Sequence, residues 1–448
     1  MSRLQRGLGG GAAVVATLLV AIALHQWHAP PPASRGIPSM EWHDAILPVL
    51  LTARAPVLLV HSPTDQWNTS LWTLDHVLSC LKRKTVEVHA ASPPVFKHYD
   101  PNLELSAKFP PPFRTFYTDA THLHTLLTSA TVEKQDAAPP PTGYYVNGEL
   151  KLLAPQLARD ISPTLPFALP SASSTIFVKL WIGGPRVVAN LHYDATHNIF
   201  HQVHGQKTFT LFPPDAFDSL YVHSRLHPSH RQSLLDLSQP DADLLARFPR
   251  YRQAFSKRVD VTLQPGETMY LPPFWFHCVL TTTPSISVNV WSHSRELALL
   301  ESLLENAMPY LVRFEANGWI HNVATHLFAL QLYVGDLLGR VFPRPRDWIA
   351  MHLDTLDRSL DDGQTWPRHQ FECGVAPHRI ARHMQTAMMA FVDATMAATF
   401  DKMPTNASKA ILMTSFVESL AAHVIDPVYV ASFLHSCVAT DPAHKTSD

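Results

Sequence analysis

This chain of 448 residues is poor in three kinds of residue, and each shortage limits what it can be. It has only four cysteines, at widely separated positions: Cys80, Cys278, Cys373 and Cys437. None of them forms a pair with the spacing of zinc ligands. Charged residues make up 16% of the chain and leave a net charge of −2, which gives no general reason to expect nucleic-acid binding. Only 16 glycines stand against 38 prolines, and the proline runs at 30–32 and 139–141 indicate stiff linkers.

Histidine, in contrast, is abundant, and one group of potential metal ligands stands out among the 27 histidines. His192 and Asp194 are two residues apart, so on a β-strand both side chains would point to the same face. His277 would supply a third ligand from a later segment. Two histidines and one carboxylate form the facial triad that leaves positions open on a non-haem Fe(II) ion. The sequence therefore predicts an iron-dependent oxygenase with its catalytic centre at these three residues.

A His-x-Asp motif arises easily by chance in a chain with so much histidine, and two other copies are interpreted as decoys. His98-Tyr-Asp100 runs into Pro101, which cannot continue a central strand. His352-Leu-Asp354 lies in a stretch that reads as helical, where residues two apart point away from each other. Three further histidines near the triad are expected to be loop or surface residues rather than ligands: His197, His201 and His204.

Segments with β-branched and aromatic residues surround the predicted triad, and several of them alternate as half-buried strands do. They are 174–182, 207–212, 259–263, 269–277 and 285–291. Metal ligands on different short strands favour a mainly β fold, a double-stranded β-helix or jelly roll, with the site inside the barrel. Residues 215–258 read as an insertion that could overhang the barrel mouth.

Beyond residue 295 the pattern changes to apolar residues at spacings of three and four, which is typical of helices. Helices are expected at 296–311, 320–341, 378–400 and 407–425. The chain is thus divided into an N-terminal segment with a proline-rich linker (1–36), the β domain (37–294) and an α-helical C-terminal region (295–448).

The N-terminal segment has the order of a secretory signal or a signal anchor. Arg3 and Arg6 precede the uncharged stretch 8–24, whose length is at the short limit for crossing a bilayer. A signal anchor is favoured over cleavage; a buried core helix or a mitochondrial presequence are the alternatives. Either form of signal predicts an endomembrane, lumen-facing or secreted protein, and two acceptor sequons, at Asn68 and Asn406, are compatible with that. Disulfides between some of the cysteines are an option in a lumen, but the sequence does not decide.

Taken together, the motifs resemble those of the Jumonji C, or cupin-type, 2-oxoglutarate-dependent oxygenases. The matching segments are His192-Tyr-Asp194, Asn198, Gly205-x-Lys207, 211–215, 265–277 and 287–291. The resemblance covers roughly residues 40 to 293, and within the family it is greatest to the branch that hydroxylates an asparagine of the hypoxia-inducible transcription factor. It implies Fe(II) as the metal, 2-oxoglutarate as the co-substrate and O₂ as the oxidant.

The resemblance also implies roles for particular residues. His192, Asp194 and His277 would ligate Fe(II), and Lys207 would pair with the distal carboxylate of 2-oxoglutarate. Asn198 and Asn289 would lie near the co-substrate and the metal. Tyr145, or else Tyr144, would donate a hydroxyl to 2-oxoglutarate.

In one position the chain departs from this pattern. Where the most similar branch has a threonine that helps to hold 2-oxoglutarate, this chain has Ala189. The missing hydrogen bond is therefore absent or comes from elsewhere, for which Thr208 and Thr210 are candidates.

The leading functional hypothesis is an enzyme that couples decarboxylation of 2-oxoglutarate to succinate with hydroxylation of a protein side chain. An aspartate in the triad, as at Asp194, is what the hydroxylases of the family carry, whereas the demethylases more often have glutamate. The alternatives are a non-catalytic binding module of the same fold, a demethylase or RNA-modifying oxygenase, and a metal cupin such as a sugar isomerase. Expected partners are a protein substrate, a membrane through the N-terminal segment, and a second copy of the chain through the C-terminal helices.

Overall fold

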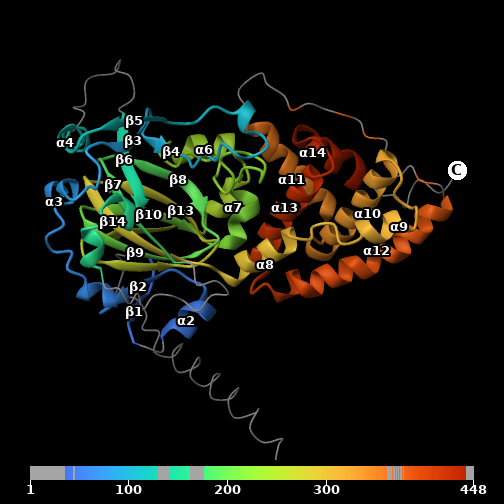
Figure 1. The fold of residues 1–448 in the computed structure, drawn as a ribbon, viewed down its shortest axis with the longest axis horizontal. Helices are drawn as coiled ribbons and strands as arrows, with labels where there is room; N and C mark the ends of the chain where they lie inside the picture. Colours follow the sequence, from blue (N-terminus) through green and yellow to red (C-terminus); the bar gives the residue numbers. More distant parts are fainter. Residues whose placement is uncertain are drawn as a thin grey trace, which may run out of the picture.

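The architecture consists of two facing β-sheets with a helical region on one side of them (Figure 1). A computed structural model describes residues 36–43, 46–129, 142–161, 176–360 and 378–439, together with Trp366, His369, Phe371, Cys373 and Ala376. The first sheet has nine strands in the order β1-β2-β12-β9-β14-β7-β6-β3-β5, and the second has five in the order β11-β10-β13-β8-β4. These two sheets confirm the predicted jelly-roll fold and the helical C-terminal region.

Most neighbouring strands in both sheets are antiparallel; β1 with β2 and β4 with β8 are the parallel pairs. In the nine-stranded sheet the bounds are β1 (Ser39–Glu41), β2 (Val57–Val60), β12 (Thr268–Leu271), β9 (His197–His204), β14 (Ser285–Ser292), β7 (Ile176–Gly183), β6 (Gly143–Glu149), β3 (Val86–Ala91) and β5 (Arg114–Thr118). In the five-stranded sheet they are β11 (Val259–Leu263), β10 (Lys207–Phe212), β13 (Phe276–Thr281), β8 (Val188–Tyr193) and β4 (Val95–Phe96). Strand β9 was not predicted, because its many polar residues suggested a loop.

The larger sheet is covered on its outer face by short helices from the N-terminal half. These are α2 (Ile46–Ala53), α3 (Leu74–Ser79), α4 (Ala120–Thr128) and α5 (Leu150–Leu153). Their apolar residues form one buried cluster with alternate residues of β7 and β14, including Leu180, Ile182 and Val288. Because side chains alternate along a strand, the other residues of β7 and β14 face the second sheet and form the inside of the barrel.

The C-terminal region packs around a second, larger apolar cluster. Its helices are α8 (Arg295–Leu304), α9 (Leu311–Ala316), α10 (Val323–Val341), α11 (Pro345–Arg358), α12 (His378–Ala398), α13 (Asn406–Ala422) and α14 (Val430–Phe433). The segment expected to be one helix over 296–311 is instead divided between α8 and α9. Pro309 lies in the break, where it lacks the backbone N–H that a helix interior requires. A disulfide joins Cys373 to Cys437.

The insertion between β10 and β11 connects this helical region to the barrel. It contains α6 (Asp241–Arg247) and α7 (Tyr251–Phe255). Glu418 on α13 accepts hydrogen bonds from the Ser224 hydroxyl and from the backbone N–H of Arg225, at 2.5 and 2.7 Å. His352 on α11 pairs with the same carboxylate at 2.7 Å. His352, from the His-x-Asp motif in the helical region, therefore has a structural role as a partner of Glu418.

The predicted signal anchor lies outside the described residues. Among those that are described, no helix combines the length and the apolar character that a membrane crossing requires. The domain bounds at 36 and 294 stay predictions, although β14 ends at Ser292 and α8 begins at Arg295. The homodimer through the C-terminal helices stays a prediction as well.

Two glycines with positive φ, in connections where the chain passes from one sheet to the other, allow a test of how tightly these turns are built. At Gly205 (φ 69°), between β9 and β10, an added Cβ would collide with the backbone oxygen of Pro284, whereas at Gly266 (φ 87°) it would meet nothing within 4 Å. Left-handed backbone alone costs an alanine about 1–2 kcal/mol, and the collision adds a comparable amount. We expect Gly205→Ala to lower the free energy of unfolding by about 3 kcal/mol and Gly266→Ala by about 1 kcal/mol in urea denaturation. Equal losses would contradict the close approach at Gly205.

Candidate metal centre and co-substrate pocket

The three predicted ligands converge inside the barrel. His192 on β8 lies directly opposite His277 on β13 in the strand register, and Asp194 follows β8 immediately. The ligand atoms of the three residues all lie within 4.8 Å of one another, and His277 Nε2 is 3.9 Å from Asp194 Oδ2. Among the residues that the structure describes, this is the one group of three or more such side chains that could hold a metal ion.

The orientation of both imidazoles is fixed by the backbone. His192 Nδ1 donates to the carbonyl oxygen of Asn190 at 2.6 Å, and His277 Nδ1 donates to that of Trp275 at 3.0 Å. Because a carbonyl can only accept, Nδ1 of each ring carries a proton, which leaves Nε2 as the nitrogen that can bind a metal. This outer contact is the one that metal-binding histidines typically make. Two neutral imidazole nitrogens and a carboxylate oxygen are ligands that suit Fe(II), so the residues present fit the predicted metal.

The electrostatics of the triad also favour a bound cation. Burial would raise the pKa of Asp194, but the charges of His192 and His277, followed by those of Arg231 and Lys179, hold this pKa below its ordinary value. Burial lowers the pKa of His277 to about 4. Near neutral pH the site therefore offers an ionised carboxylate and an unprotonated imidazole, the forms in which both residues bind metal.

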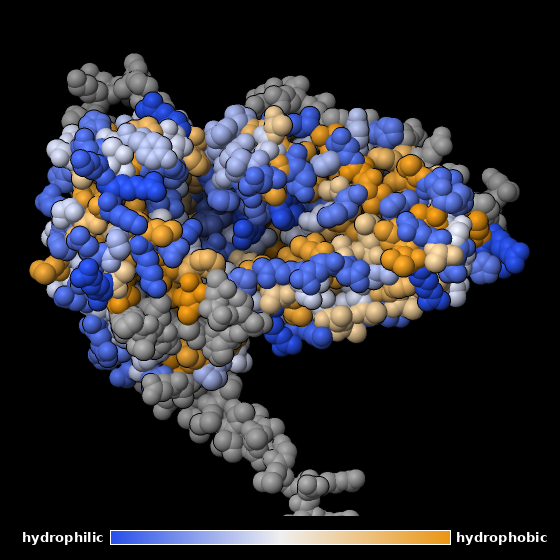
Figure 2. All heavy atoms as spheres, viewed as in Figure 1, coloured by the Kyte–Doolittle hydropathy of each residue, from blue (hydrophilic) through white to orange (hydrophobic). Residues whose placement is uncertain are grey.

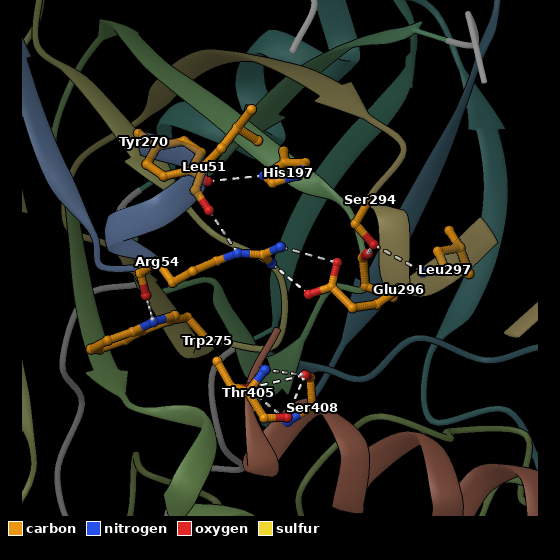
Figure 3. Close-up of polar contacts among 11 residues, drawn as sticks. Leu51, Arg54, His197, Tyr270, Trp275, Ser294, Glu296, Leu297, Thr405 and Ser408 are labelled. Carbon is orange, nitrogen blue, oxygen red and sulfur yellow. Dashed lines mark hydrogen bonds and ion pairs between the residues drawn. The ribbon is translucent and has the colours of Figure 1, made fainter. Parts of the chain in front are cut away.

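Contacts outside the barrel hold the segment that carries His277. The Trp275 indole N–H donates to the carbonyl oxygen of Arg54 at 2.8 Å, and the Arg54 guanidinium pairs with the fully buried carboxylate of Glu296 (Figure 3). Glu296 lies in the first turn of α8, behind the cap formed by Ser294. The end of α2, the start of α8 and the approach to β13 are thereby joined two residues before the third ligand.

The three histidines that were expected to be loop or surface residues are in fact on strand β9, and that prediction was wrong for two of them. His197 and His201 are buried on the face of β9 opposite Asn198. His197 Nδ1 and the Tyr270 hydroxyl point toward each other (Figure 3) and are 2.9 Å apart, and His201 Nδ1 lies 2.9 Å from the Thr268 hydroxyl. Burial lowers their pKa values to about 3 and about 4. As expected, none of the three joins the triad.

A cavity of about 400 Å³ opens beside the triad, between the two sheets. All seven predicted site residues line it: His192, Asp194, His277, Lys207, Asn198, Asn289 and Tyr145. Asn289 Nδ2 donates to Asn198 Oδ1 at 3.0 Å, which fixes both amides in the wall of the cavity. Tyr145 lines the cavity, and burial raises its pKa to about 12, so its hydroxyl keeps its proton. Tyr144 packs instead against the cluster on the outer face.

Lys207 is buried in this cavity without a carboxylate partner among the described residues. Its side chain is 7% exposed, and its ammonium donates to the Ser287 hydroxyl at 2.8 Å. Burial lowers its pKa to about 7. A buried ammonium that lacks a counter-charge is costly to maintain, and a bound dicarboxylate would supply one.

The two threonines proposed to replace the missing hydroxyl at Ala189 do not do so. Thr208 and Thr210 point to the opposite face of β10, where they bond Thr262 at 2.9 Å and Asp260 at 2.5 Å. Alternation along β10 requires this once Lys207 faces inward. A threonine that does line the cavity is Thr281, the cross-strand neighbour of Lys207 on β13.

Sequence reasoning missed several residues of the cavity wall. Lys179 on β7 sits across from Asn289, and it could have been found by counting alternate residues along the predicted strand. Arg231 and Gln232 come from the insertion, which runs beside β8: the backbone N–H of Tyr193 donates to the carbonyl oxygen of Arg231 at 3.2 Å. No sequence pattern marks these two. The other decoy, His98, also lines the cavity, while Asp100 bonds Asn102 outside it.

Comparisons with known proteins agree with this geometry. Residues 47–296, more than half of the chain, match the family described as the cupin-like domain. Over 153 residues the chain is 31% identical to "Jumonji C domain-containing protein 5" of Drosophila melanogaster (33% of this chain, 36% of the relative). It is 24% identical over 274 residues to "tRNA wybutosine-synthesizing protein 5" of Mus musculus (59% and 78%). With human "Bifunctional peptidase and (3S)-lysyl hydroxylase JMJD7" it shares 31% over 164 residues (31% and 48%).

The match to the fly and human relatives thus spans less than half of their length. These matches confirm the predicted resemblance to the wider Jumonji C, cupin-like family. The prediction that the chain is most similar to the asparaginyl hydroxylase branch stays a prediction.

The buried ammonium of Lys207 gives the ligand-free protein a defined pH dependence. Its pKa is about 7 in the folded protein, against 10.5 in the unfolded chain. Between these values the unfolded chain binds the proton and the folded protein does not, so the free energy of unfolding rises with pH, by up to about 1.4 kcal/mol per unit. Urea denaturation at about pH 7.5 and about pH 9.5 should show wild type gaining stability relative to Lys207→Met over this interval.

The matched control is Lys257→Met, because Lys257 is solvent-exposed and pairs with Asp215 at 2.9 Å. That variant should track wild type. A constant difference between wild type and Lys207→Met would mean that Lys207 stays charged in the folded state.

Proposed function

This chain belongs to the cupin-like domain family, and from that premise we propose that it is an Fe(II)- and 2-oxoglutarate-dependent oxygenase that hydroxylates a protein side chain. One observation carries the proposal: a His-Asp-His triad and an uncompensated buried ammonium face the same cavity. The triad suits a ferrous ion, and the ammonium suits the far end of a dicarboxylate. A sugar isomerase or another metal cupin would not need the buried ammonium of Lys207.

The residues of the cavity have separate tasks in this proposal. His192, Asp194 and His277 hold the metal and leave positions open for the co-substrate and oxygen. Lys207 binds the distal carboxylate of 2-oxoglutarate, with Ser287 orienting its ammonium, and the hydroxyls of Tyr145 and Thr281 are available as further donors. The metal and co-substrate supply the oxidative chemistry, in which decarboxylation to succinate accompanies insertion of oxygen into a C–H bond.

The apolar residues of the cavity keep bulk water from the reacting atoms. Phe200 and Phe209 pack edge to face near Lys207, and Trp181 and Trp291 form part of the wall on the nine-stranded sheet. The Asn198–Asn289 pair limits where a substrate group can lie relative to the metal. Orientation and the exclusion of water are thus the contribution of the protein.

The substrate class is the finer part of the proposal. A protein substrate is favoured by the aspartate of the triad and by the net charge of −2, which offers no general attraction for a nucleic-acid backbone. The human relative bears the name of a lysyl hydroxylase. A second candidate, an RNA-modifying oxygenase, is favoured by the mouse relative named for tRNA wybutosine synthesis, of which the match covers 78%. Removal of an N-methyl group would use the same metal centre, and a binding module without turnover would use the same fold.

We also propose that the protein works in an oxidising compartment of the endomembrane system or outside the cell. The pairing of Cys373 with Cys437 supports this, because stable disulfides are rare in the reducing cytosol. The uncharged stretch 8–24 behind two arginines supports a signal anchor and a membrane contact.

Removal of a metal ligand tests the central proposal. We expect wild-type protein with Fe(II) to convert 2-oxoglutarate to succinate, and His192→Ala to lower that rate at least about a hundredfold, about 2.7 kcal/mol of transition-state stabilisation. Succinate is measured by mass spectrometry. Asp100→Ala, from the decoy motif, serves as the control and should keep the wild-type rate. Unchanged turnover in His192→Ala would show that this triad is not the catalytic centre.

The proposed role of Lys207 predicts a defect that added co-substrate overcomes. Loss of a hydrogen bond to a charged group costs about 1.5–3 kcal/mol, so Lys207→Ala should raise the KM for 2-oxoglutarate by about ten- to a hundredfold. The maximal rate of succinate formation should return at high 2-oxoglutarate. A variant with normal KM would exclude Lys207 from co-substrate binding, and would favour a cupin with a different reaction.

A further inference from the structure

Two cations of the cavity wall have no role in the function proposed above. Lys179 lies on β7 in the nine-stranded sheet, and Arg231 lies on the insertion beside β8 in the five-stranded sheet, so they face the cavity from opposite walls. Both are half-buried, and both act electrostatically on Asp194. No ion pair joins either one to a carboxylate within the part of the chain that the structure describes. Lys97 also lines the cavity, but Asp236 opposes its charge.

The charges of the loaded cavity show why these two cations need an explanation. Asp194 is the only acidic residue among the described residues that line it. If the site holds Fe(II) and 2-oxoglutarate, the metal and Lys207 together balance the co-substrate and Asp194. The positive charges of Lys179 and Arg231 then remain unmatched in a half-buried space, where an unpaired charge is unfavourable. A ligand that completes this cavity must therefore bring negative charge.

The backbone of Arg231 is held in one strained conformation by its hydrogen bonds to β8. Arg231 has φ 65°, a left-handed conformation that costs a residue with a Cβ about 1–2 kcal/mol. The surroundings hold it there: its carbonyl accepts from the backbone N–H of Tyr193, and the N–H of Ser233 donates to the carbonyl of Leu191 at 2.7 Å. These two bonds set Gln232 opposite His192. Strained backbone of this kind clusters at functional sites.

The position of Lys179 on the opposite wall, in the nine-stranded sheet, is also fixed by its neighbours. Its ammonium lies 5.0 Å from the centre of the Trp291 ring, and its cross-strand neighbour is Asn289, which also lines the cavity. A cation over an indole face and beside a fixed amide keeps its charge directed at the cavity. Figure 2 shows a recess lined by hydrophilic residues between the strands and the C-terminal helices.

We propose that Lys179 and Arg231 form a carboxylate-binding site for an acidic peptide, with the anionic side chain at or next to the residue that is oxidised. This inference rests on the proposed function and narrows its substrate class. A cavity of about 400 Å³ accommodates one or two side chains, and the unmatched cations are confined to it. The net charge of −2 speaks against the extended phosphate contacts that a nucleic acid would need.

Peptide binding to a redox-inert complex tests the proposal without any turnover. Full-length protein is loaded with Mn(II) and N-oxalylglycine, an unreactive analogue of 2-oxoglutarate, and titrated with the blocked peptides Ac-AADAA-NH2 and Ac-AANAA-NH2. Fluorescence reports binding, because Trp181 and Trp291 line the cavity. We expect the aspartyl peptide to bind at least tenfold more tightly than its asparaginyl isostere. The preference should vanish in Lys179→Gln/Arg231→Gln and persist in Arg231→Lys, which keeps the charge.

Arg252→Gln is the matched control, because Arg252 is exposed on α7 and does not line the cavity. It should keep the full preference. Equal affinity for the two peptides in wild type, no binding of either at millimolar concentration, or a preference that survives the double variant would overturn the proposal. Tighter binding of a short RNA oligonucleotide, lost in the double variant, would also overturn it and assign the cations to phosphates. Metal-dependent binding of N-oxalylglycine is measured first: if it is absent, the proposed function fails together with this inference, whereas intact binding without discrimination removes only the carboxylate site.

Discussion

The site depends on the antiparallel register between β8 and β13, which sets His192 directly opposite His277. Side chains alternate along both strands, so a shift of one residue would turn one imidazole out of the barrel and destroy the convergence of ligands. The same strand β13 pairs with β10 on its other side, where Thr281 meets Lys207. One strand therefore fixes the distance between the metal ligands and the end of the cavity that holds the ammonium.

The same alternation lets single strands serve two purposes. On β14, Ile286, Val288 and Val290 belong to the apolar cluster under the outer helices, while Asn289 lines the cavity and Ser287 accepts from the Lys207 ammonium. The apolar face gives β14 its stability, and its polar face can then hold groups that add nothing to the apolar core, such as Ser287, which accepts a hydrogen bond from the buried ammonium of Lys207 on β10. Buried charge without a partner is accepted where a ligand is expected to complete it.

Sequence patterns were sufficient for the residues that carry chemistry and insufficient for those that shape access to them. The triad was predicted from two motifs, because ligand type, spacing and strand context agree; Lys207 followed from the family resemblance. His197 and His201 were misjudged, because polarity suggested exposure, whereas each has a single hydroxyl partner in the core, Tyr270 or Thr268. Thr208 and Thr210 were wrongly proposed to supply the hydroxyl that is missing at Ala189. Because side chains alternate along β10 and Lys207 faces the cavity, both threonines face away from it. Arg231 was beyond prediction, because its place depends on how an irregular insertion lies against β8.

The buried carboxylate of Glu418 joins the C-terminal helices to the insertion between β10 and β11, but not to the strands that carry the triad. It lies on α13, far along the chain from the metal ligands, and it holds the insertion at Ser224 and Arg225, a few residues before Arg231. The three residues of the His-Asp-His triad, by contrast, are supported by β8, β13 and the start of α8. A change in the packing of α13 would thus reach the wall of the cavity at Arg231 before it reached the triad, so the shape of the cavity can vary while the three converging side chains stay in place.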